Sequence, residues 1–243
     1  MRVLTGVYAH PDDETFSAGG TFAKCSAAGV RCTLFCATHG DAGKLHGTRA
    51  VSRSELGATR RRELEAASVI LGIHDVDLRG HADGALAQVN QDDLIGEIVA
   101  HIRRVRSTVV VTFGPEGAPN AHADHRAISR AATAAFFLAG NEGAYPDQLA
   151  GGVTPHAPAR LFFGTWPPPA PDAKLRTRGT PATARLDVRS FIETEWKAFA
   201  AHDSQSHLRE RFAEMCATDD ELFALASGTS QTTAVISDLF DGL

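Results

Sequence analysis

Short apolar runs alternate with longer segments of helical periodicity over the first two thirds of this chain. The expected strands are residues 3–9, 31–38, 75–78, 108–113 and 160–164, and the expected helices are residues 16–28, 59–71, 91–104 and 127–138. Gly72 is expected to end the second of these helices. Strands that alternate with helices in this way form parallel sheets with right-handed crossovers. The pattern predicts an α/β fold, with a Rossmann-like, mainly parallel sheet and helices on both faces.

A chain of 243 residues is long enough for one large core, so we expect a single domain over residues 1–243. Residues 151–184 are rich in proline, which favours an ordered loop with one strand inside it. This proline-rich region is either a wall or lid of a pocket or a surface excursion without functional contacts. Beyond it, residues 184–188 read as a strand, and residues 191–201 and 209–225 read as helical.

The composition excludes several classes of function. A formal net charge of -5 provides no basic surface for nucleic acid or for an anionic membrane. No stretch approaches the ~20 apolar residues of a membrane span, and the start of the chain does not read as a signal peptide. The four cysteines form no Cys-x-x-Cys pair and have no zinc-finger spacing, so we expect ordinary thiols in a reducing compartment. We therefore expect a cytoplasmic protein without nucleic-acid or membrane partners, and a homo-oligomer stays open.

The segment Ala9-His-Pro-Asp-Asp-Glu14 follows directly on the first expected strand. Imidazole and carboxylate groups both bind zinc, and a second carboxylate beside them can take a proton from water. The alternative interpretation is an ordinary helix start, with Asp12 as the N-cap and Glu14 favourable to the helix dipole. The segment thus supplies either half of a metal site together with a base, or a helix cap.

A second cluster, His122-Ala-Asp-His125, follows the strand expected over 108–113 and a turn rich in glycine and proline. The two histidines are three residues apart and share a face if a helix has begun, and Asp124 can orient one imidazole. The carboxyl ends of parallel strands meet at one edge of a sheet, so we expect an active site where Asp12, Gly40 and His122 meet. Dinucleotide binding is disfavoured, because no Gly-x-Gly-x-x-Gly follows any expected strand.

With these clusters in this order, the chain resembles the zinc-dependent N-acetylglucosaminyl deacetylases of the LmbE/PIG-L type. The resemblance rests on residues 9–14, 38–43, 60–64, 71–72, 83–86, 122–125 and 197–205. Two positions depart from the family pattern. Ala123 stands where the family usually has proline, and Asn120 stands where some members have a tyrosine, which argues against a tyrosine-assisted mechanism.

The resemblance implies a zinc ion held by His10, Asp13 and His125, with Asp12 as the general base. It also implies that His122 stabilises the oxyanion, as an imidazolium oriented by Asp124.

By the same resemblance, Arg60 and Asp83 hold sugar hydroxyls or the group attached to the sugar. Their ordinary alternatives are a solvent-facing helix arginine and a turn aspartate before Gly84. His202 and Gln205 lie in a matching segment and either line the pocket or brace it.

The implied reaction is hydrolysis of the N-acetyl group of a small molecule or glycoside that contains N-acetylglucosamine, with release of acetate. Two alternatives stay open. One is an amidase that cleaves a different amide of a sugar-thiol conjugate, and the other is a sugar-binding module with a silent centre. The presence of all five clustered residues argues against a silent centre; these are His10, Asp12, Asp13, His122 and His125.

Overall fold

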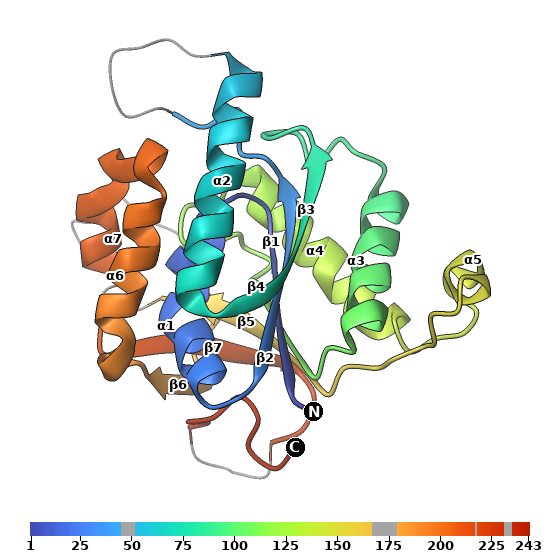
Figure 1. Cartoon of the computed structure of the whole chain (residues 1–243). Coiled ribbons are helices and arrows are strands. Elements are labelled where there is room, and N and C mark those ends of the chain that lie inside the picture. The colour runs from blue at the N-terminus through green and yellow to red at the C-terminus, as the bar shows by residue number, and fades with distance from the viewer. Residues whose placement is uncertain (45–51, 167–178, 217, 231–234) are drawn as a thin grey trace.

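A computed structural model of the chain describes residues 1–44, 52–166, 179–216, 218–230 and 235–243 (Figure 1). The strands are β1 (Val3–Tyr8), β2 (Arg31–Thr38), β3 (Ile73–His81), β4 (Val109–Phe113), β5 (Arg160–Thr165), β6 (Ala184–Asp187) and β7 (Asp220–Ser227). The α-helices are α1 (Asp13–Ala27), α2 (Arg53–Leu71), α3 (Gln91–Val105), α4 (Ala123–Leu138), α5 (Pro146–Ala150), α6 (Ile192–Ala201) and α7 (Arg209–Met215). Short 3-10 turns cover Arg189–Phe191 and Asp203–Leu208.

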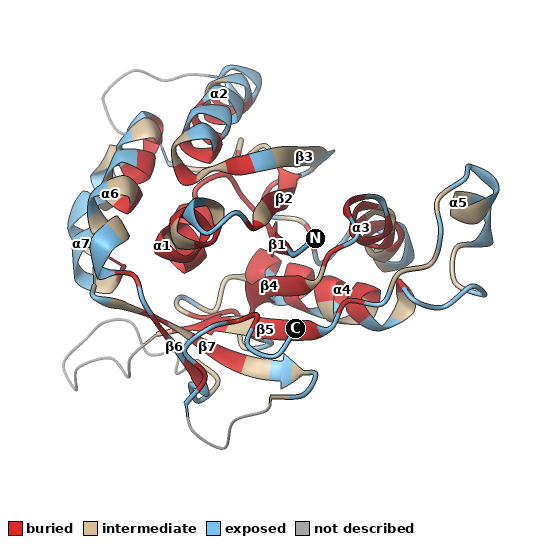
Figure 2. Ribbon diagram, turned by 60° about the horizontal axis from the view of Figure 1, so that its bottom comes forward, coloured by how far each residue is buried: buried red, intermediate tan, exposed pale blue. Residues whose placement is uncertain are grey.

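The strands form one sheet in the order β3-β2-β1-β4-β5-β7-β6. The first five strands in this order run parallel, and β7 runs antiparallel to both β5 and β6. Helices α1, α2 and α6 cover one face, while α3 and α4 cover the other (Figure 2). The predicted α/β class, the mainly parallel sheet and the helices on both faces are confirmed.

The prediction of a helical region over residues 209–225 is wrong in its second half. Helix α7 stops at Met215, and Asp220–Ser227 forms β7, which fills the place between β5 and β6. Leucine and alanine in this segment favour a helix locally. Pairing with two neighbouring strands outweighs that preference, because it supplies hydrogen bonds on both edges and buries Phe223 and Ala224.

Helices α1, α2 and α4 begin earlier than the periodicity predicts, whereas α3 begins at residue 91 as predicted. Helix α2 begins at Arg53 behind Ser52, whose side chain accepts the backbone N–H of Glu55 in a capping box. Gly72 ends this helix in the left-handed conformation, as predicted. None of the described helices is long and apolar enough to span a membrane.

The proline-rich region contains β5, as predicted, and β6 begins at its end. Residues 167–178, which are 12 of the 34 residues of this region, lie outside the described residues. Their role as a lid therefore stays a prediction.

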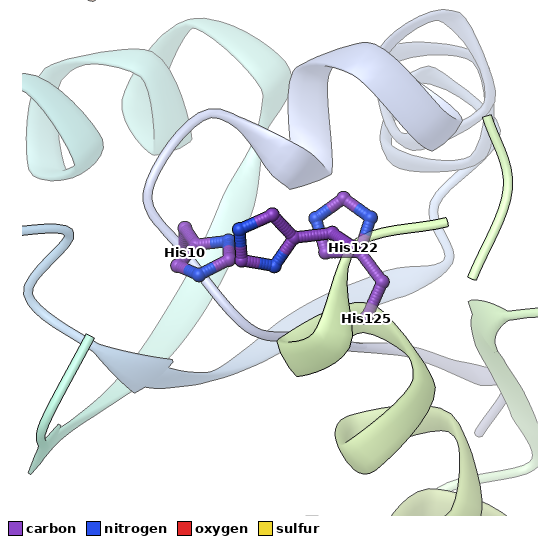
Figure 3. Close-up of side chains that lie close together, drawn as sticks. All are labelled: His10, His122 and His125. Carbon is purple, nitrogen blue, oxygen red and sulfur yellow. The ribbon is translucent and has the colours of Figure 1, made fainter. Parts of the chain in front are cut away.

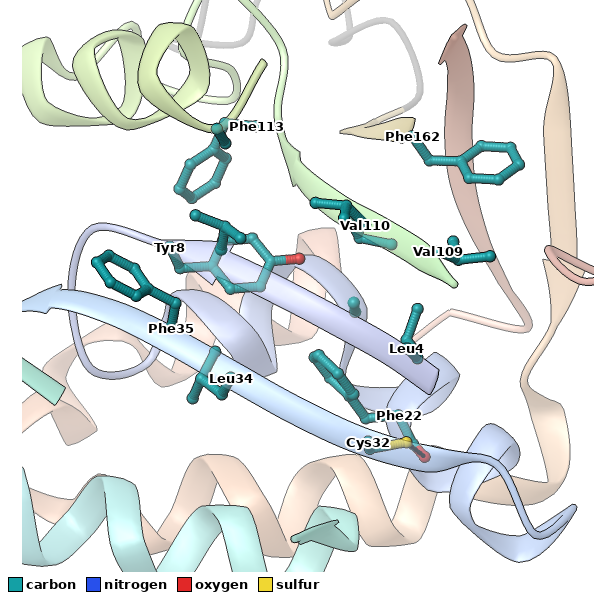
Figure 4. Close-up of a cluster of buried hydrophobic side chains, with 14 of the residues drawn as sticks. Leu4, Tyr8, Phe22, Cys32, Leu34, Phe35, Val109, Val110, Phe113 and Phe162 are labelled. Atoms are coloured by element: carbon teal, nitrogen blue, oxygen red, sulfur yellow. Dashed lines mark hydrogen bonds between the residues drawn. The ribbon is translucent and has the colours of Figure 1, made fainter. Parts of the chain in front are cut away.

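The core lies on both sides of β1, β2 and β4. Tyr8, Phe22, Leu34, Phe35 and Val110 are fully buried and fill the layers between the sheet and its helices (Figure 4). Strands β1 and β4 are buried along their whole lengths, as expected for the centre of a parallel sheet.

The strand order places a switch point between β1 and β4. From β1 the chain moves outward to β2 and β3, and it then returns to the other side of β1 as β4. Open α/β sheets bind ligands in the crevice at such a point, beyond the carboxyl ends of the strands. The loops that leave β1 and β4 carry the two predicted clusters.

One buried carboxyl group has no hydrogen-bond partner in the part of the chain that the structure describes. Glu195 on α6 is 1% exposed, and neither of its carboxylate oxygens has a hydrogen-bond partner among the described residues. Nearby, Glu221 of β7 accepts the backbone N–H groups of Gly20 and Thr21. Burial, and then the charge of Glu221, raise the pKa of Glu195 to about 10.

We expect Glu195→Gln to stabilise the protein more at pH 8 than at pH 5. The folded-state pKa of Glu195 lies above its unfolded value of ~4.3, so the folded state retains a proton that the unfolded state releases. Stability is therefore lost as pH rises from that unfolded value toward the folded one. Urea unfolding at both pH values measures the effect, with the exposed Glu193→Gln on the same helix as control. Equal effects at the two pH values would contradict an ionisation penalty at Glu195.

Candidate metal centre and active-site cavity

A cavity of about 350 Å³ opens at the carboxyl ends of β1 and β4. Seven of the eight predicted site residues line it: His10, Asp12, Asp13, Arg60, Asp83, His122 and His125. The eighth, Asp124, is fully buried behind the wall. The fold thus brings together residues that lie far apart in the sequence.

Asp13 lies between two histidines. Its Oδ2 is 3.3 Å from His10 Nδ1, and its Oδ1 is 3.3 Å from His125 Nε2. The backbone N–H groups of Ala9 and His10 also donate to Oδ2, at 3.2 and 2.8 Å. Burial alone would raise the pKa of Asp13, but His125 and His10 hold it well below its ordinary value. The carboxyl group is therefore ionised, as a metal ligand must be.

The three histidines of the two clusters converge in the cavity (Figure 3). One nitrogen each of His10, His122 and His125 lies within 4.8 Å of the others. Asp13 thus contacts both His10 and His125. His122 lies close enough to these two histidines that all three could bind the same metal ion. His125 Nδ1 is buried and has no hydrogen-bond partner among the described residues.

This donor set fits a metal ion. Imidazole nitrogens and a carboxylate are typical zinc ligands, and a ligating histidine usually donates its second ring N–H to a carboxylate or carbonyl. His10 has such partners, because its Nε2 lies 3.2 Å from Asp124 Oδ2 and 3.0 Å from Asp83 Oδ1. The opposite nitrogen, Nδ1, faces Asp13. The centre could hold a metal ion.

Asp124 orients His10 rather than His122. Besides His10, its carboxylate accepts the backbone N–H groups of Gly84 at 2.7 Å and Leu86 at 3.0 Å. Asp124 thus orients an imidazole, as predicted. The prediction that this imidazole is His122 is wrong, because the ring is that of His10. The motif places Asp124 on the first turn of α4, and the turn at Gly84 fixes the direction of its carboxylate.

His122 does not match the imidazolium that we expected. It is the N-cap of α4, and its Nδ1 accepts the backbone N–H of Asp124 at 3.2 Å. An accepting nitrogen carries no proton, so the neutral ring carries its hydrogen on Nε2. Burial, followed by the charges of His10 and His125, lowers the pKa of His122. A neutral N–H donor is the form that this site favours.

Asp12 adopts a left-handed backbone conformation, with φ 99°. Its side chain makes no helix-cap hydrogen bond, so the alternative role of an ordinary N-cap is not realised. Instead its Oδ2 pairs with Arg60 Nη2 at 2.9 Å. Burial raises the pKa of Asp12 to about 6 against the opposing charge of Arg60, and Asp13 adds to the increase. A carboxyl group with a pKa near neutrality can both accept and return a proton.

Glu14 and His202 hold the strained turn at Asp12 from behind. Glu14 Oε2 accepts the backbone N–H of Asp12 at 3.0 Å, and Glu14 Oε1 lies 2.8 Å from His202 Nε2. Both side chains are at most 1% exposed. His202 therefore braces the site, whereas Gln205 lines the cavity. Our sequence analysis assigned Glu14 no such role, although the residue lies in the first motif.

Arg60 and Asp83, the predicted substrate-binding residues, are held by protein groups in this structure. Besides Asp12, the Arg60 guanidinium donates to the carbonyls of Gly40 and Pro11. Gly40 has φ 63°, and a Cβ at that position would collide with the guanidinium. Asp83 accepts the backbone N–H of Ala42 at 2.7 Å and contacts His10. Both side chains line the cavity, and their contact with a sugar stays a prediction.

No tyrosine is found among the described residues that line the cavity. The chain has two tyrosines: Tyr8 is buried in the core, and Tyr145 donates to Asp92 at 2.8 Å. Asn120, at the position of the tyrosine in some family members, accepts the backbone N–H of His122 through Oδ1 at 3.1 Å. This part of the site thus holds His122 in place.

Aromatic residues that sequence analysis did not single out complete one wall. The Phe113 ring stacks on His125 with centroids 3.9 Å apart and planes 8° apart. Trp166 stacks on Phe113 at 6.5 Å and 25°. Phe113 ends β4 and Trp166 follows β5, so the parallel pairing of these strands produces the stack. In the sequence, only their position at the ends of expected strands could have indicated that these two residues line the site.

Comparison with known proteins identifies the family. Residues 6–136 match the family model described as PIG-L, GlcNAc-PI de-N-acetylase. The chain belongs to the PIG-L family. This match covers both clusters, the carboxyl end of β1 and all of β4, the two strands that the clusters follow.

Relatives of this PIG-L protein include named deacetylases. It is 29% identical to a 1D-myo-inositol 2-acetamido-2-deoxy-alpha-D-glucopyranoside deacetylase of Rhodococcus erythropolis, over 98% of this chain and 96% of the relative. It is 35% identical to a probable N-acetyl-alpha-D-glucosaminyl L-malate deacetylase of Bacillus cereus, over 54% of this chain and 59% of the relative. The N,N'-diacetylchitobiose deacetylase of Pyrococcus horikoshii has the same fold, with a TM-score of 0.77, 20% identity, and coverage of 98% of this chain and 89% of that chain.

Proposed function

We propose that this protein hydrolyses the N-acetyl group of a small molecule or glycoside that contains N-acetylglucosamine and releases acetate and a free amine. The observation that carries the proposal is the arrangement of His10, Asp13 and His125 around one cavity, with Asp12 beside them. Membership of the PIG-L family and the names of the relatives support the same reaction.

In this proposal, His10, Asp13 and His125 hold zinc. The ion would supply Lewis acidity, which polarises an amide carbonyl and promotes the ionisation of water. Asp83 and Asp124 fix the orientation of the His10 ring, so that Nδ1 is kept toward Asp13. The acidic surroundings of His10 favour a divalent cation at this position over an anion.

Asp12 acts as the general base. It accepts a proton from water as the oxygen bonds to the acetyl carbon, and it returns that proton to the amine nitrogen as the C–N bond breaks. Arg60 keeps the Asp12 carboxylate in place, while Glu14 and His202 hold its backbone. His122 donates its Nε2 hydrogen to the oxygen that becomes negative in the transition state. Arg60 and Asp83 bind the sugar from the same rim.

We also place the protein in the cytoplasm, with an N-acetylated sugar compound as its partner. All four cysteines are free and buried, as is usual in a reducing compartment.

The test is an acetate-release assay of the zinc-loaded protein over N-acetylglucosaminides with different aglycones. We expect one equivalent of acetate and one free amine for each turnover. Cleavage of a sugar-thiol conjugate without acetate release would favour the amidase alternative instead. Tight binding without cleavage of either bond would favour a silent sugar-binding module.

A further inference from the structure

One end of the cavity differs in chemistry from the metal centre. The aromatic stack of His125, Phe113 and Trp166 leads from the histidines toward this second end. There the cavity is lined by what we call the apolar arm: Phe16, Trp166, Leu208, Arg211 and Met215. The arm contains a single charged side chain, the guanidinium of Arg211.

Helix α7 presents Arg211 to the cavity. Leu208, Arg211 and Met215 follow one another at spacings of three and four, so they share one face of the helical turn. The neighbouring Phe212 is fully buried, stacks on Phe199 with ring centroids 4.3 Å apart, and meets the Phe16 ring edge-to-face at 5.2 Å. At the end of the helix, the Cys216 thiol donates to the backbone carbonyl of Phe16 at 3.1 Å. The rotation of α7 is thereby fixed with Arg211 facing the arm.

The half-buried guanidinium of Arg211 is only partly satisfied by the described residues. Its Nη2 is buried without a hydrogen-bond partner, and its Nε reaches only the Met215 sulfur at 3.5 Å. No ion pair to a described carboxylate is formed. Arg60, in contrast, is paired with Asp12. A guanidinium N–H that is withdrawn from water and lacks an acceptor is unfavourable until an acceptor arrives.

We infer that the apolar arm is a subsite for an aglycone that is itself apolar and carries a carboxylate, which Arg211 binds. This inference rests on the proposed function, which places the acetamido sugar at the metal end. The planar guanidinium matches a carboxylate with two parallel hydrogen bonds. The walls of Phe16, Trp166, Leu208 and Met215 suit an aryl or alkyl group rather than a polyhydroxylated ring.

The distribution of charge supports an anion at this end. The cavity carboxylates Asp12, Asp13 and Asp83 are grouped around His10 and Arg60. None of the five residues that form the arm is acidic. A small adjoining cavity shares Phe16, Trp166 and Met215 and is also lined by Glu195, Glu221 and Asp220; burial raises the pKa of the two glutamates, and Asp220 pairs with Arg185. A neutral aglycone would leave the guanidinium N–H without a charged acceptor.

The test compares two glycosides of the same shape, 4-carboxyphenyl and 4-carbamoylphenyl N-acetyl-α-glucosaminide, as substrates of the zinc-loaded full chain. We expect the wild type to favour the carboxylate in kcat/KM by about 10- to 100-fold, the size expected for a hydrogen bond to a charged group. Arg211→Gln should reduce this ratio to near unity, and Arg211→Lys should retain part of it. The matched control is Arg209→Gln, an exposed arginine on the same helix that lies over the Trp196 ring.

Two results would overturn the inference: a wild-type ratio near unity, or an Arg211→Gln variant with the wild-type ratio. If neither glycoside is deacetylated, the proposed function fails on its own. In that case titration calorimetry with the same two compounds decides the role of Arg211. Tighter binding of the carboxylate by the wild type, lost in Arg211→Gln and retained in Arg209→Gln, supports the subsite, and equal binding of the two compounds refutes it.

Discussion

A His10→Ala, His125→Ala double variant is expected to lose its bound zinc and all measurable deacetylation, starting from about one zinc per chain in the wild type. Both imidazoles contact the same carboxylate, that of Asp13. Removing them leaves one carboxylate where an open zinc site uses three protein ligands. Elemental analysis of the purified protein measures the metal, and acetate release measures the activity.

The control is His74→Ala, which removes an exposed histidine at the surface of β3. It should retain the wild-type zinc content. The variant His122→Ala tests whether His122 is also a metal ligand, because one of its ring nitrogens lies within 4.8 Å of a nitrogen of His10 and of His125. We expect this variant to retain zinc. Loss of zinc in His122→Ala would add His122 to the ligand set, and retained zinc in the double variant would contradict the proposed position of the metal.

Hydrophobic periodicity predicted the order and type of most elements, because their local and tertiary preferences agree. Buried parallel strands such as β1 and β4 read as continuous apolar runs, and the helices between them show one apolar stripe. The agreement ends at Asp220–Ser227, where a helix-prone sequence forms β7. This segment is a strand because it pairs with β5 and β6. Those strands lie elsewhere in the chain, so the local sequence pattern does not reveal the pairing.

The composition of the site could also be predicted, because strand ends on one edge of a sheet must meet. The sequence did not define which groups pair within the site. Asp124 lies next to His125 and two residues after His122, yet its carboxylate turns toward His10 and the turn at Gly84. Such pairing depends on side-chain direction and on loops distant in sequence. For the same reason the sequence did not indicate that Arg211 lines the cavity, since this depends on the packing of α7 beside Phe16.

The second large loss of activity is expected when Asp12 is replaced by asparagine. Its carboxylate faces the cavity beside the predicted ligands, but its closest charged partner is Arg60 Nη2 at 2.9 Å. Glu14 holds the backbone N–H of the same residue. The turn therefore has supports that do not depend on the charge of Asp12. Asparagine has the same shape and can still accept the Arg60 hydrogen bond, so the substitution removes proton acceptance while the turn is kept.

Asp12→Asn should retain wild-type zinc content and lose turnover by about 10²- to 10⁴-fold, the usual contribution of a general base. The effect should fall on kcat and kcat/KM together, because the proton is transferred only in the transition state. Asp41→Asn, at the same rim but outside the cavity lining, serves as the charge-matched control and should keep its turnover. A thermal midpoint of Asp12→Asn equal to that of the wild type excludes a folding defect from the loss of the Arg60 ion pair. If Asp12→Asn instead loses zinc, Asp12 is a ligand, and the roles that we propose for Asp12 and Asp13 are reversed.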